Sequence, residues 1–253
     1  YTPIGGKSTV NPQGMVDSIT GKATSKEVDS VLGWDFKVDG EIYKLPGGSL
    51  ASAVGTEYRR ESLDYQPDYA IQNGSVSPFN IQQPLVANRD SMAVFGELQV
   101  PIFGEDLKIP AFQKLTVSVA LRYEDYSDVG DTGVKPRVSF NWQPLDEQFT
   151  IHGSWSQGFI APSFNDLYQL PGQDFVEVYN PYTGTRSQPD EAVLTVGNST
   201  LKPVNSESYL IGGMWDPKFL KGFSVGIDYY RIRQTGIPFS SAQFIVNQWF
   251  AYN

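Results

Sequence analysis

Residues 113–163 read QKLTVSVALRYEDYSDVGDTGVKPRVSFNWQPLDEQFTIHGSWSQGFIAPS. Apolar and polar side chains alternate in three successive segments of this stretch, at 113–124, 134–142 and 149–156. Successive side chains of a β-strand point to opposite faces, so this alternation predicts strands rather than helices. The segments are roughly 10 residues long, and about 9–11 tilted residues cross a bilayer, whereas strands of globular proteins have about 5–6. The stretch therefore predicts three membrane-spanning strands.

The two rows of side chains differ in chemistry. One row is apolar and holds Leu115, Val117, Val119, Leu121 and Tyr123, then Val134, Val138, Phe140 and Trp142, then Phe149, Ile151 and Trp155. The other row carries polar and charged groups, among them Arg122, Glu124, Lys135, Arg137, Asn141 and His152. A small β-sandwich would bury so many charges only at heavy cost, whereas a water-filled or plugged barrel lumen can hold them. The pattern favours a barrel with its apolar row facing lipid.

Composition excludes several classes of protein. The chain has 253 residues, no cysteine and a single histidine, His152, so disulfides, thiolate sites and histidine-cluster zinc sites are not expected. The net charge is −9 and no cluster of Lys and Arg appears, which argues against nucleic-acid binding. Aromatic residues make up 13% of the chain, which suits the aromatic girdles of an outer-membrane barrel but also a well-packed soluble β protein.

The rest of the chain extends this organisation. Residues 1–30 have no sustained period and predict a loop or weakly structured segment, and residues 31–253 predict a partial barrel. Further strands are expected at about 31–43, 50–60, 90–100, 205–215 and 222–233. Long loops at about 61–89 and 159–204 mostly alternate with shorter connections, as in outer-membrane barrels, whose turns are short on one rim and whose loops are long on the other. The predicted fold is all-β, an antiparallel transmembrane β-barrel segment.

Membrane insertion through helices is not expected, since no continuous apolar run approaches 18 residues. The chain begins at Tyr1 without a signal peptide. Either a signal peptide has been removed or the chain is a piece of a longer protein, and we favour the second interpretation.

Five short motifs, in order along the chain, resemble those of TonB-dependent outer-membrane receptors. The segment GFIAPS at 158–163 resembles the family's Gly-Phe-Arg-Ala-Pro-Ser, and GNSTLKPVNS at 197–206 resembles Gly-Asn-Pro-Asp-Leu-Lys-Pro-Glu-Thr-Ser. The other three are GTEYRRES at 55–62, RYEDYSDVG with KPRVSFNWQP at 122–144, and GIDYYRI at 226–232. Ile160 stands where the family usually has Arg, and Val204 where it usually has Glu, which leaves details of the loop base open.

The resemblance implies a plugged barrel of about 22 strands, of which about eight are visible here. It also implies an N-terminal plug domain with a box that contacts TonB, and neither is found in this chain. We therefore expect an internal segment of the barrel, in the outer membrane of a Gram-negative bacterium. The implied structural motif residues are Gly158, Phe159, Ala161, Pro162, Ser163, Asn198, Leu201, Lys202 and Pro203.

Candidate ligand-contacting residues lie in the loop at 159–204, because aromatic and Arg side chains in loops on a rigid scaffold often bind ligands. They are Tyr168, Phe175, Tyr179, Tyr182 and Arg186. Packing within the loop or against neighbouring loops is an equal alternative. For the segment at 158–163, a structural strand exit that ends at Pro162 is favoured over a ligand-contacting hinge.

No catalytic, metal or cofactor site is predicted. Asp125, Asp128 and Asp131 do not have the spacing of an EF-hand, and a solvated acidic turn is the favoured interpretation. His152 lies on one strand face with Ser154 and Ser156, and no nucleophile elbow accompanies them. The chain is therefore not expected to be an enzyme.

The leading functional hypothesis is active import of a scarce nutrient with energy from TonB, the nutrient being a ferric siderophore, a cobalamin or an oligosaccharide. Partners would be TonB, the nutrient, outer-membrane lipid and, as a further alternative, a surface lipoprotein. Two other hypotheses stay open: a soluble all-β carbohydrate-binding or hydrolase domain, and a passive porin. In the soluble domain, the apolar rows would meet across a sandwich core.

Overall fold

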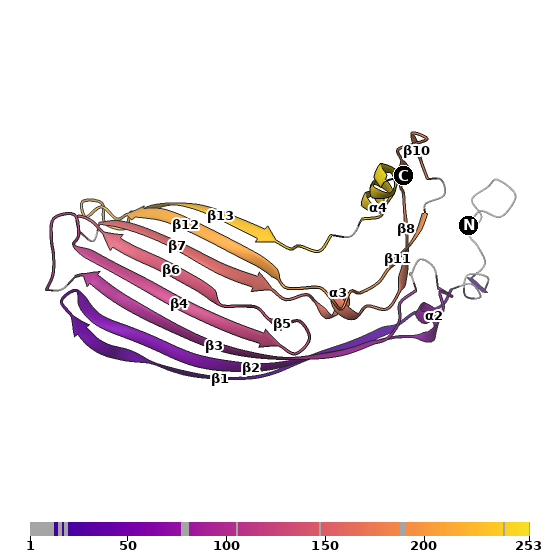
Figure 1. The fold of residues 1–253 in the computed structure, drawn as a ribbon, viewed down its shortest axis with the longest axis horizontal. Coiled ribbons are helices and arrows are strands. Elements are labelled where there is room, and N and C mark those ends of the chain that lie inside the picture. Colours follow the sequence, from indigo (N-terminus) through magenta and orange to yellow (C-terminus); the bar gives the residue numbers. More distant parts are fainter. Residues whose placement is uncertain are drawn as a thin grey trace.

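The structure is a computed structural model that describes residues 20–252, apart from 77–80, 105, 147, 188–190 and 240, together with residues 13, 14 and 17. Its main body is a single antiparallel sheet in the order β1-β2-β3-β4-β6-β7-β12-β13, with the short β5 beside β4 (Figure 1). The long strands are β1 (Ser25–Leu45), β2 (Gly48–Pro67), β3 (Leu85–Phe103), β4 (Lys114–Tyr126), β6 (Lys135–Gln143), β7 (Phe149–Ile160), β12 (Val204–Trp215) and β13 (Val225–Thr235).

The eight strands on the main path match the number expected from the alternation, but several are longer than expected. β1 begins at Ser25, so the prediction of a loop over 1–30 is wrong for residues 25–30, while most of residues 1–19 lie outside the described part. β2 runs on to Pro67 and β3 begins at Leu85, which shortens the loop predicted at 61–89 to 68–84. The backbone ladder between β2 and β3 continues to Tyr65 opposite Leu85, and this pairing overrides the polar local sequence.

Smaller helices and strands lie at one end of the sheet. They are α2 (Tyr69–Gln72), α3 (Phe164–Tyr168), α4 (Ala242–Tyr252), the two-residue β5 (Gly130–Asp131), the ladder of β8 (Gly172–Val176) with β11 (Glu191–Thr195), and the ladder of β9 (Tyr179–Asn180) with β10 (Thr185–Arg186). All except β5 lie within or after the long connections. None of the helices in the described part is both long and apolar enough to cross a bilayer.

One face of the sheet is apolar and open. Leu32 of β1 is 67% exposed and Ile227 of β13 is 78% exposed, and Val54, Val94 and Val119 lie on the same face between them. No second sheet covers this face among the described strands. The apolar rows therefore do not meet across a core, which contradicts the soluble sandwich alternative and fits a lipid-facing surface.

Aromatic side chains gather near the short turns. Phe112 packs against Phe103 at 5.1 Å between ring centroids and against Trp142 at 5.4 Å, and Phe149 lies 6.4 Å from Trp215. About midway along β1 and β2, Trp34 and Tyr58 stack at 6.1 Å. The aromatic level near the short turns matches one girdle of an outer-membrane barrel.

Candidate ligand-binding rim and lumen face

The long connections of the sheet meet at one end, which we call the rim. Its described part comprises residues 68–76, 81–84, 127–134, 161–187, 191–203, 236–239 and 241–252, and it carries α2, α3, α4 and the two short ladders (Figure 1). The short turns lie at the opposite end of the sheet. β1, β2 and β3 have 21, 20 and 19 residues, more than the about 9–11 needed to cross a bilayer, so they form a wall that reaches up to the rim.

A buried arginine ties the rim to this wall. The Arg89 residue at the start of β3 is 5% exposed, and its Nε donates to Asp128 Oδ1 at 2.9 Å and to Oδ2 at 2.8 Å. Its Nη2 donates to the carbonyl oxygen of Pro162 at 2.8 Å. The guanidinium also lies over the rings of Tyr126, at 5.4 Å, and Phe164, at 5.0 Å. A buried charge is tolerated when it is paired and hydrogen-bonded, and Arg89 has both a carboxylate partner and a backbone acceptor.

The α3 helix sits directly on this arginine. Phe164 and Tyr168 stack at 6.4 Å, and the Tyr168 hydroxyl donates to Asp128 Oδ2 at 3.4 Å. Burial, and then the negative charge of Asp128, raise the pKa of the Tyr168 phenol. Tyr168 is one of the candidate ligand contacts, and its ring and hydroxyl contact Phe164 and Asp128 of the chain itself.

The two motif segments meet at the same helix. The Ser163 hydroxyl caps α3 by accepting from the Asp166 amide at 3.1 Å, and the Asp166 carboxylate accepts from the Ser163 amide at 3.0 Å. From the second segment, the Asn198 amide donates to the Asp166 carbonyl at 2.7 Å, and the Gly197 amide donates to the Gln169 carbonyl at 2.8 Å. The predicted strand exit at 158–163 is therefore one half of a packed junction.

The approach at Gly197 leaves no space for a side chain. A Cβ atom there would lie 2.6 Å from the Gln169 nitrogen and 2.7 Å from the Tyr168 nitrogen. Asn198 orders the following turn, since its Oδ1 accepts from the Thr200 amide at 3.0 Å and from the Thr200 hydroxyl at 2.7 Å.

The other candidate ligand residues point to solvent. Tyr182 is 86% exposed, Phe175 and Tyr179 are also exposed, and Arg186 makes a surface ion pair with Glu177. They lie on β8, β9, β10 and the turn between β9 and β10, farther from the sheet than α3 (Figure 1).

The α4 helix contacts the tip of this loop. The side chain of Gln243 accepts from the Tyr179 amide at 2.7 Å and donates to the Tyr179 carbonyl at 2.8 Å. The rings of Tyr182 and Phe250 stack at 6.4 Å with an interplanar angle of 6°. The exposed ring of Tyr182 and the half-buried ring of Phe250 thus join the loop to α4, two segments that are distant in sequence.

A cavity of about 260 Å³ lies between the wall and α3. Leu63 of β2 and Leu85 of β3, both buried, line it together with Tyr65. Its polar lining consists mainly of side-chain amides, namely Gln82, Gln83, Asn165 and Gln169, with one carboxylate, Glu27.

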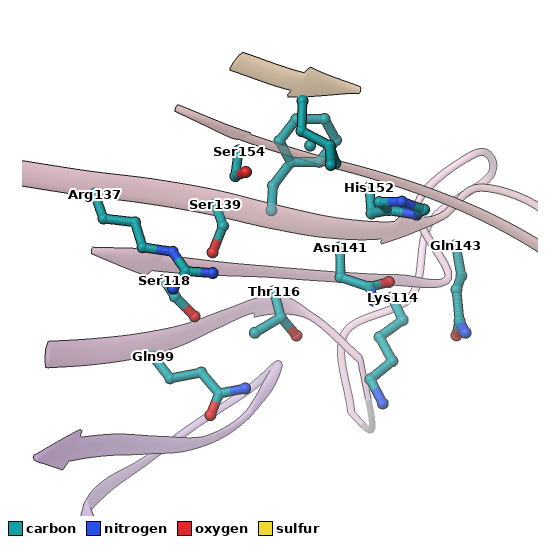
Figure 2. Close-up of a pocket in the computed structure, with 13 residues that line it drawn as sticks. Gln99, Lys114, Thr116, Ser118, Arg137, Ser139, Asn141, Gln143, His152 and Ser154 are labelled. Carbon is teal, nitrogen blue, oxygen red and sulfur yellow. The ribbon is translucent and has the colours of Figure 1, made fainter. Parts of the chain in front are cut away.

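The polar face of the sheet forms a second, open cavity of about 520 Å³ (Figure 2). Side chains of β3, β4, β6 and β7 line it, including Gln99, Lys114, Thr116, Ser118, Arg137, Ser139, Asn141, Gln143, His152 and Ser154. Arg137, Asn141 and His152 all come from the polar row predicted to face a lumen. The apolar and polar rows of side chains therefore lie on opposite faces of the sheet, as the alternation predicts.

Charged groups on this face pair across intervening strands. Arg122 of β4 bridges to Glu57 of β2, with Ala93 of β3 on the same face between them. His152 Nε2 of β7 lies 2.8 Å from Asp228 Oδ1 of β13, above Gly212 of β12. A Cβ at Gly212 would overlap the Asp228 carboxylate. His152 therefore has a carboxylate partner but no arrangement of a catalytic triad.

The prediction of a solvated acidic turn at Asp125, Asp128 and Asp131 is wrong for one of these residues, Asp128. Asp128 is buried beneath Arg89, whereas Asp131 Oδ1 accepts from the Gly133 amide at 3.1 Å in the exposed part of the turn. Among the described residues, no group of three or more potential ligand side chains could hold a metal ion.

Sequence reasoning missed Arg89, which it placed at the end of a loop. The signal was present: Leu85, Ala87, Arg89, Ser91 and Ala93 are every second residue, and all are buried in β3. Extending the alternation of 90–100 towards the N-terminus would have placed Arg89 on the inward row.

Comparison with solved structures finds the same fold in outer-membrane receptors. The ferric enterobactin receptor PfeA of Pseudomonas aeruginosa matches with a TM-score of 0.60 at 17% identity, over 82% of this chain and 27% of that chain. The siderophore receptor PirA of Acinetobacter baumannii matches with a TM-score of 0.57 at 17% identity, over 85% of this chain and 28% of that chain. The siderophore receptor PirA of P. aeruginosa matches with a TM-score of 0.56 at 17% identity, over 84% of this chain and 33% of that chain. At these identities the similarity shows the fold alone.

The chain thus spans about a quarter to a third of the receptors it matches. No curated protein matches the sequence. The family model described as "TonB dependent receptor-like, beta-barrel" matches residues 3–253. This is a family of transporters, not enzymes, in the outer membrane of Gram-negative bacteria. The chain therefore belongs to the TonB-dependent receptor family, of whose β-barrel it forms a part.

Proposed function

We propose that the receptor containing this chain binds a scarce nutrient at the rim and imports it into the periplasm with energy supplied through TonB. The observation that carries the proposal is that the rim has a buried base and an exposed outer loop. Arg89 and Asp128 form a buried ion pair at its base, while the loop beyond α3 presents exposed aromatic side chains. Binding residues are commonly found on loops that a rigid scaffold positions.

Four of the predicted contact residues remain candidates under this proposal, namely Phe175, Tyr179, Tyr182 and Arg186. Tyr and Arg are enriched among residues that dominate binding energy. The polar cavity in Figure 2 supports passage of a hydrated ligand, because its lining offers hydroxyl, amide and charged groups. Siderophores are one candidate nutrient class, since PfeA and PirA are siderophore receptors.

The proposed partners follow from the family. TonB would act through other parts of the receptor, and outer-membrane lipid would cover the apolar face. A surface lipoprotein that closes over the rim is an additional proposed partner, for which the exposed ring of Tyr182, stacked on Phe250, offers a contact site.

The test is removal of the distal loop from the full-length receptor. Because Gly197 is hydrogen-bonded to Gln169, residues 171–195 can be replaced by two glycines without stretching the junction at α3. We expect loss of ligand binding and of TonB-dependent uptake in whole cells, with a barrel that still resists SDS until heated.

A matched control replaces residues 218–221, in the turn between β12 and β13 at the opposite end, by glycines. It should leave binding unchanged. Full uptake by the variant that lacks the distal loop would contradict the role of the rim, and uptake that persists without TonB would indicate a passive pore.

A further inference from the structure

The rim has few positive charges. Residues 68–84 contain no Lys or Arg, and residues 236–253 contain no charged residue at all. The longest connection, 161–203, contains five acidic residues but only two basic ones, Arg186 and Lys202. A surface of one sign repels ligands of the same sign and lowers their local concentration.

The arginine of the rim, Arg186, and the arginine at its base, Arg89, both have carboxylate partners. Arg89 is buried and neutralised by Asp128, and Arg186 pairs with Glu177. Recognition of a polyanion normally uses Arg or Lys groups that are free to form charge-assisted hydrogen bonds. Among the described residues of the rim, Lys202 is then the one basic side chain without an ion pair, whereas a ferric tris-catecholate, a trianion, would require several such groups.

The cavity between the wall and α3 offers different chemistry. The side-chain amides of Asn165 and Gln169 have no hydrogen-bond partner among the described residues, and both line the cavity. Beneath them lie the apolar side chains of Leu63 and Leu85 and the ring of Tyr65. An apolar floor with a few positioned polar groups is typical of small-molecule sites. Amides both donate and accept, which suits hydroxyl groups.

We propose that this cavity binds one unit of a neutral, hydroxyl-rich ligand of the oligosaccharide class, and that the receptor does not take ferric catecholates. The proposal rests on the import function and names the class of nutrient. The volume of the cavity, about 260 Å³, lies just below the usual range of about 300–1,000 Å³ for whole ligands, so the cavity holds a part of the ligand.

The experiment uses the full-length receptor in detergent with two kinds of probe. The neutral probes are hexasaccharides of α- and β-linked glucan, xylan and mannan, and the anionic probe is ferric enterobactin. We expect at least one hexasaccharide to bind and ferric enterobactin not to bind. Gln169→Leu should weaken hexasaccharide binding about tenfold, the effect of one lost hydrogen bond together with a ligand hydroxyl left unpaired. Gln157→Leu, an exposed amide of β7 outside the cavity, should leave it unchanged.

Each other result overturns the proposal. Binding of ferric enterobactin, failure of every hexasaccharide, or equal affinities of the Gln169→Leu and unmodified receptors would reject the assigned ligand class or the assigned cavity. Measuring uptake by whole cells distinguishes failure of the proposed ligand class from failure of the proposed import function. TonB-dependent uptake of ferric enterobactin would reject the oligosaccharide proposal alone, whereas a hexasaccharide that binds but is not taken up would reject import alone.

Discussion

At the scale of single residues, the rim depends on charges that the chain satisfies internally. Arg89 makes three kinds of contact at once: with a carboxylate, a backbone carbonyl and two aromatic rings. These contacts join the start of β3, the turn after β4 and the segment that follows β7, which are far apart in the sequence. The loop at 161–203 therefore begins from a fixed point, although most of it lies outside the sheet.

Arg89→Ala tests this junction in the full-length receptor. The substitution leaves Asp128 buried without its partner, and breaking a buried ion pair typically costs about 3–5 kcal/mol. The opening equilibrium of residues 160–170 should rise at least about 100-fold, measured by amide hydrogen exchange. Arg60→Ala is the control, because its contact with Asp90 is exposed and 3.6 Å long, and such pairs contribute about 0–1 kcal/mol. Equal exchange in the two variants would refute the role of Arg89.

Asp68 gives the rim a dependence on pH. Its carboxylate accepts from the Thr24 amide at 2.6 Å and from the Ile71 amide at 3.1 Å, and these bonds, the one to Thr24 first, lower its pKa. A carboxyl group with a lower pKa in the folded state stabilises that state above its unfolded pKa, and this stabilisation is lost as the pH falls through the folded value. Residues 68–76 should therefore loosen below about pH 4.

The measurement is the rate of limited proteolysis within 68–76 by pepsin, between pH 2 and pH 5, for the unmodified receptor and for Asp68→Asn. The unmodified receptor should become more susceptible as the pH falls, after correction for pepsin activity on a denatured substrate. Asp68→Asn should be susceptible throughout and nearly independent of pH. Parallel profiles for both proteins would show that another group is responsible.

At the scale of elements, alternation predicted the membrane-spanning parts of the strands well and their extensions poorly. The central segments, such as 113–124 in β4, have a regular apolar row because lipid faces one side. Residues 25–30 of β1 have only one large apolar side chain, Val28, since that part reaches beyond the lipid. Its strand structure comes from pairing with residues 62–67 of β2, which no local pattern reveals.

The candidate site was only partly predictable for the same reason. Tyr168 and Tyr182 have the same side chain in the same loop, yet one packs on Asp128 and the other is open to solvent. Composition identified the loop, but which of its residues are free depends on α3, a helix of five residues that is too short for a periodic signal.

The two faces of β4 allow a direct test with adjacent residues. Val119 lies on the apolar face between Leu98 and Val138, and Ser118 lies on the polar face between Gln99 and Ser139. Val119→Arg should destabilise the full-length receptor by about 2–4 kcal/mol, the cost of Arg at the bilayer midplane. Ser118→Arg should cost clearly less, because its side chain enters the polar face. Urea unfolding in lipid vesicles measures both, and a larger cost for Ser118→Arg would reverse the assignment of the faces.

At the scale of the whole molecule, the sheet has two edges in the described part of the chain, β1 and β13, each paired on one side only. Long unpaired edges template aggregation, and in lipid every backbone polar group must be satisfied within the protein. The apolar face adds a surface that water does not stabilise. Closure with further strands, as in the receptors that share this fold, would remove both problems.

We therefore expect residues 1–253 alone, expressed without detergent or lipid, to aggregate rather than form a soluble monomer. In the full-length receptor the same residues should belong to a barrel that resists SDS until it is heated, because the edges are then paired. Size-exclusion chromatography and chemical unfolding of the isolated chain provide the measurement, with the full-length receptor in detergent as the control. A soluble monomer that unfolds cooperatively would show that the apolar face finds cover within these residues, and the lipid-facing assignment of Leu32, Val119 and Ile227 would then be wrong.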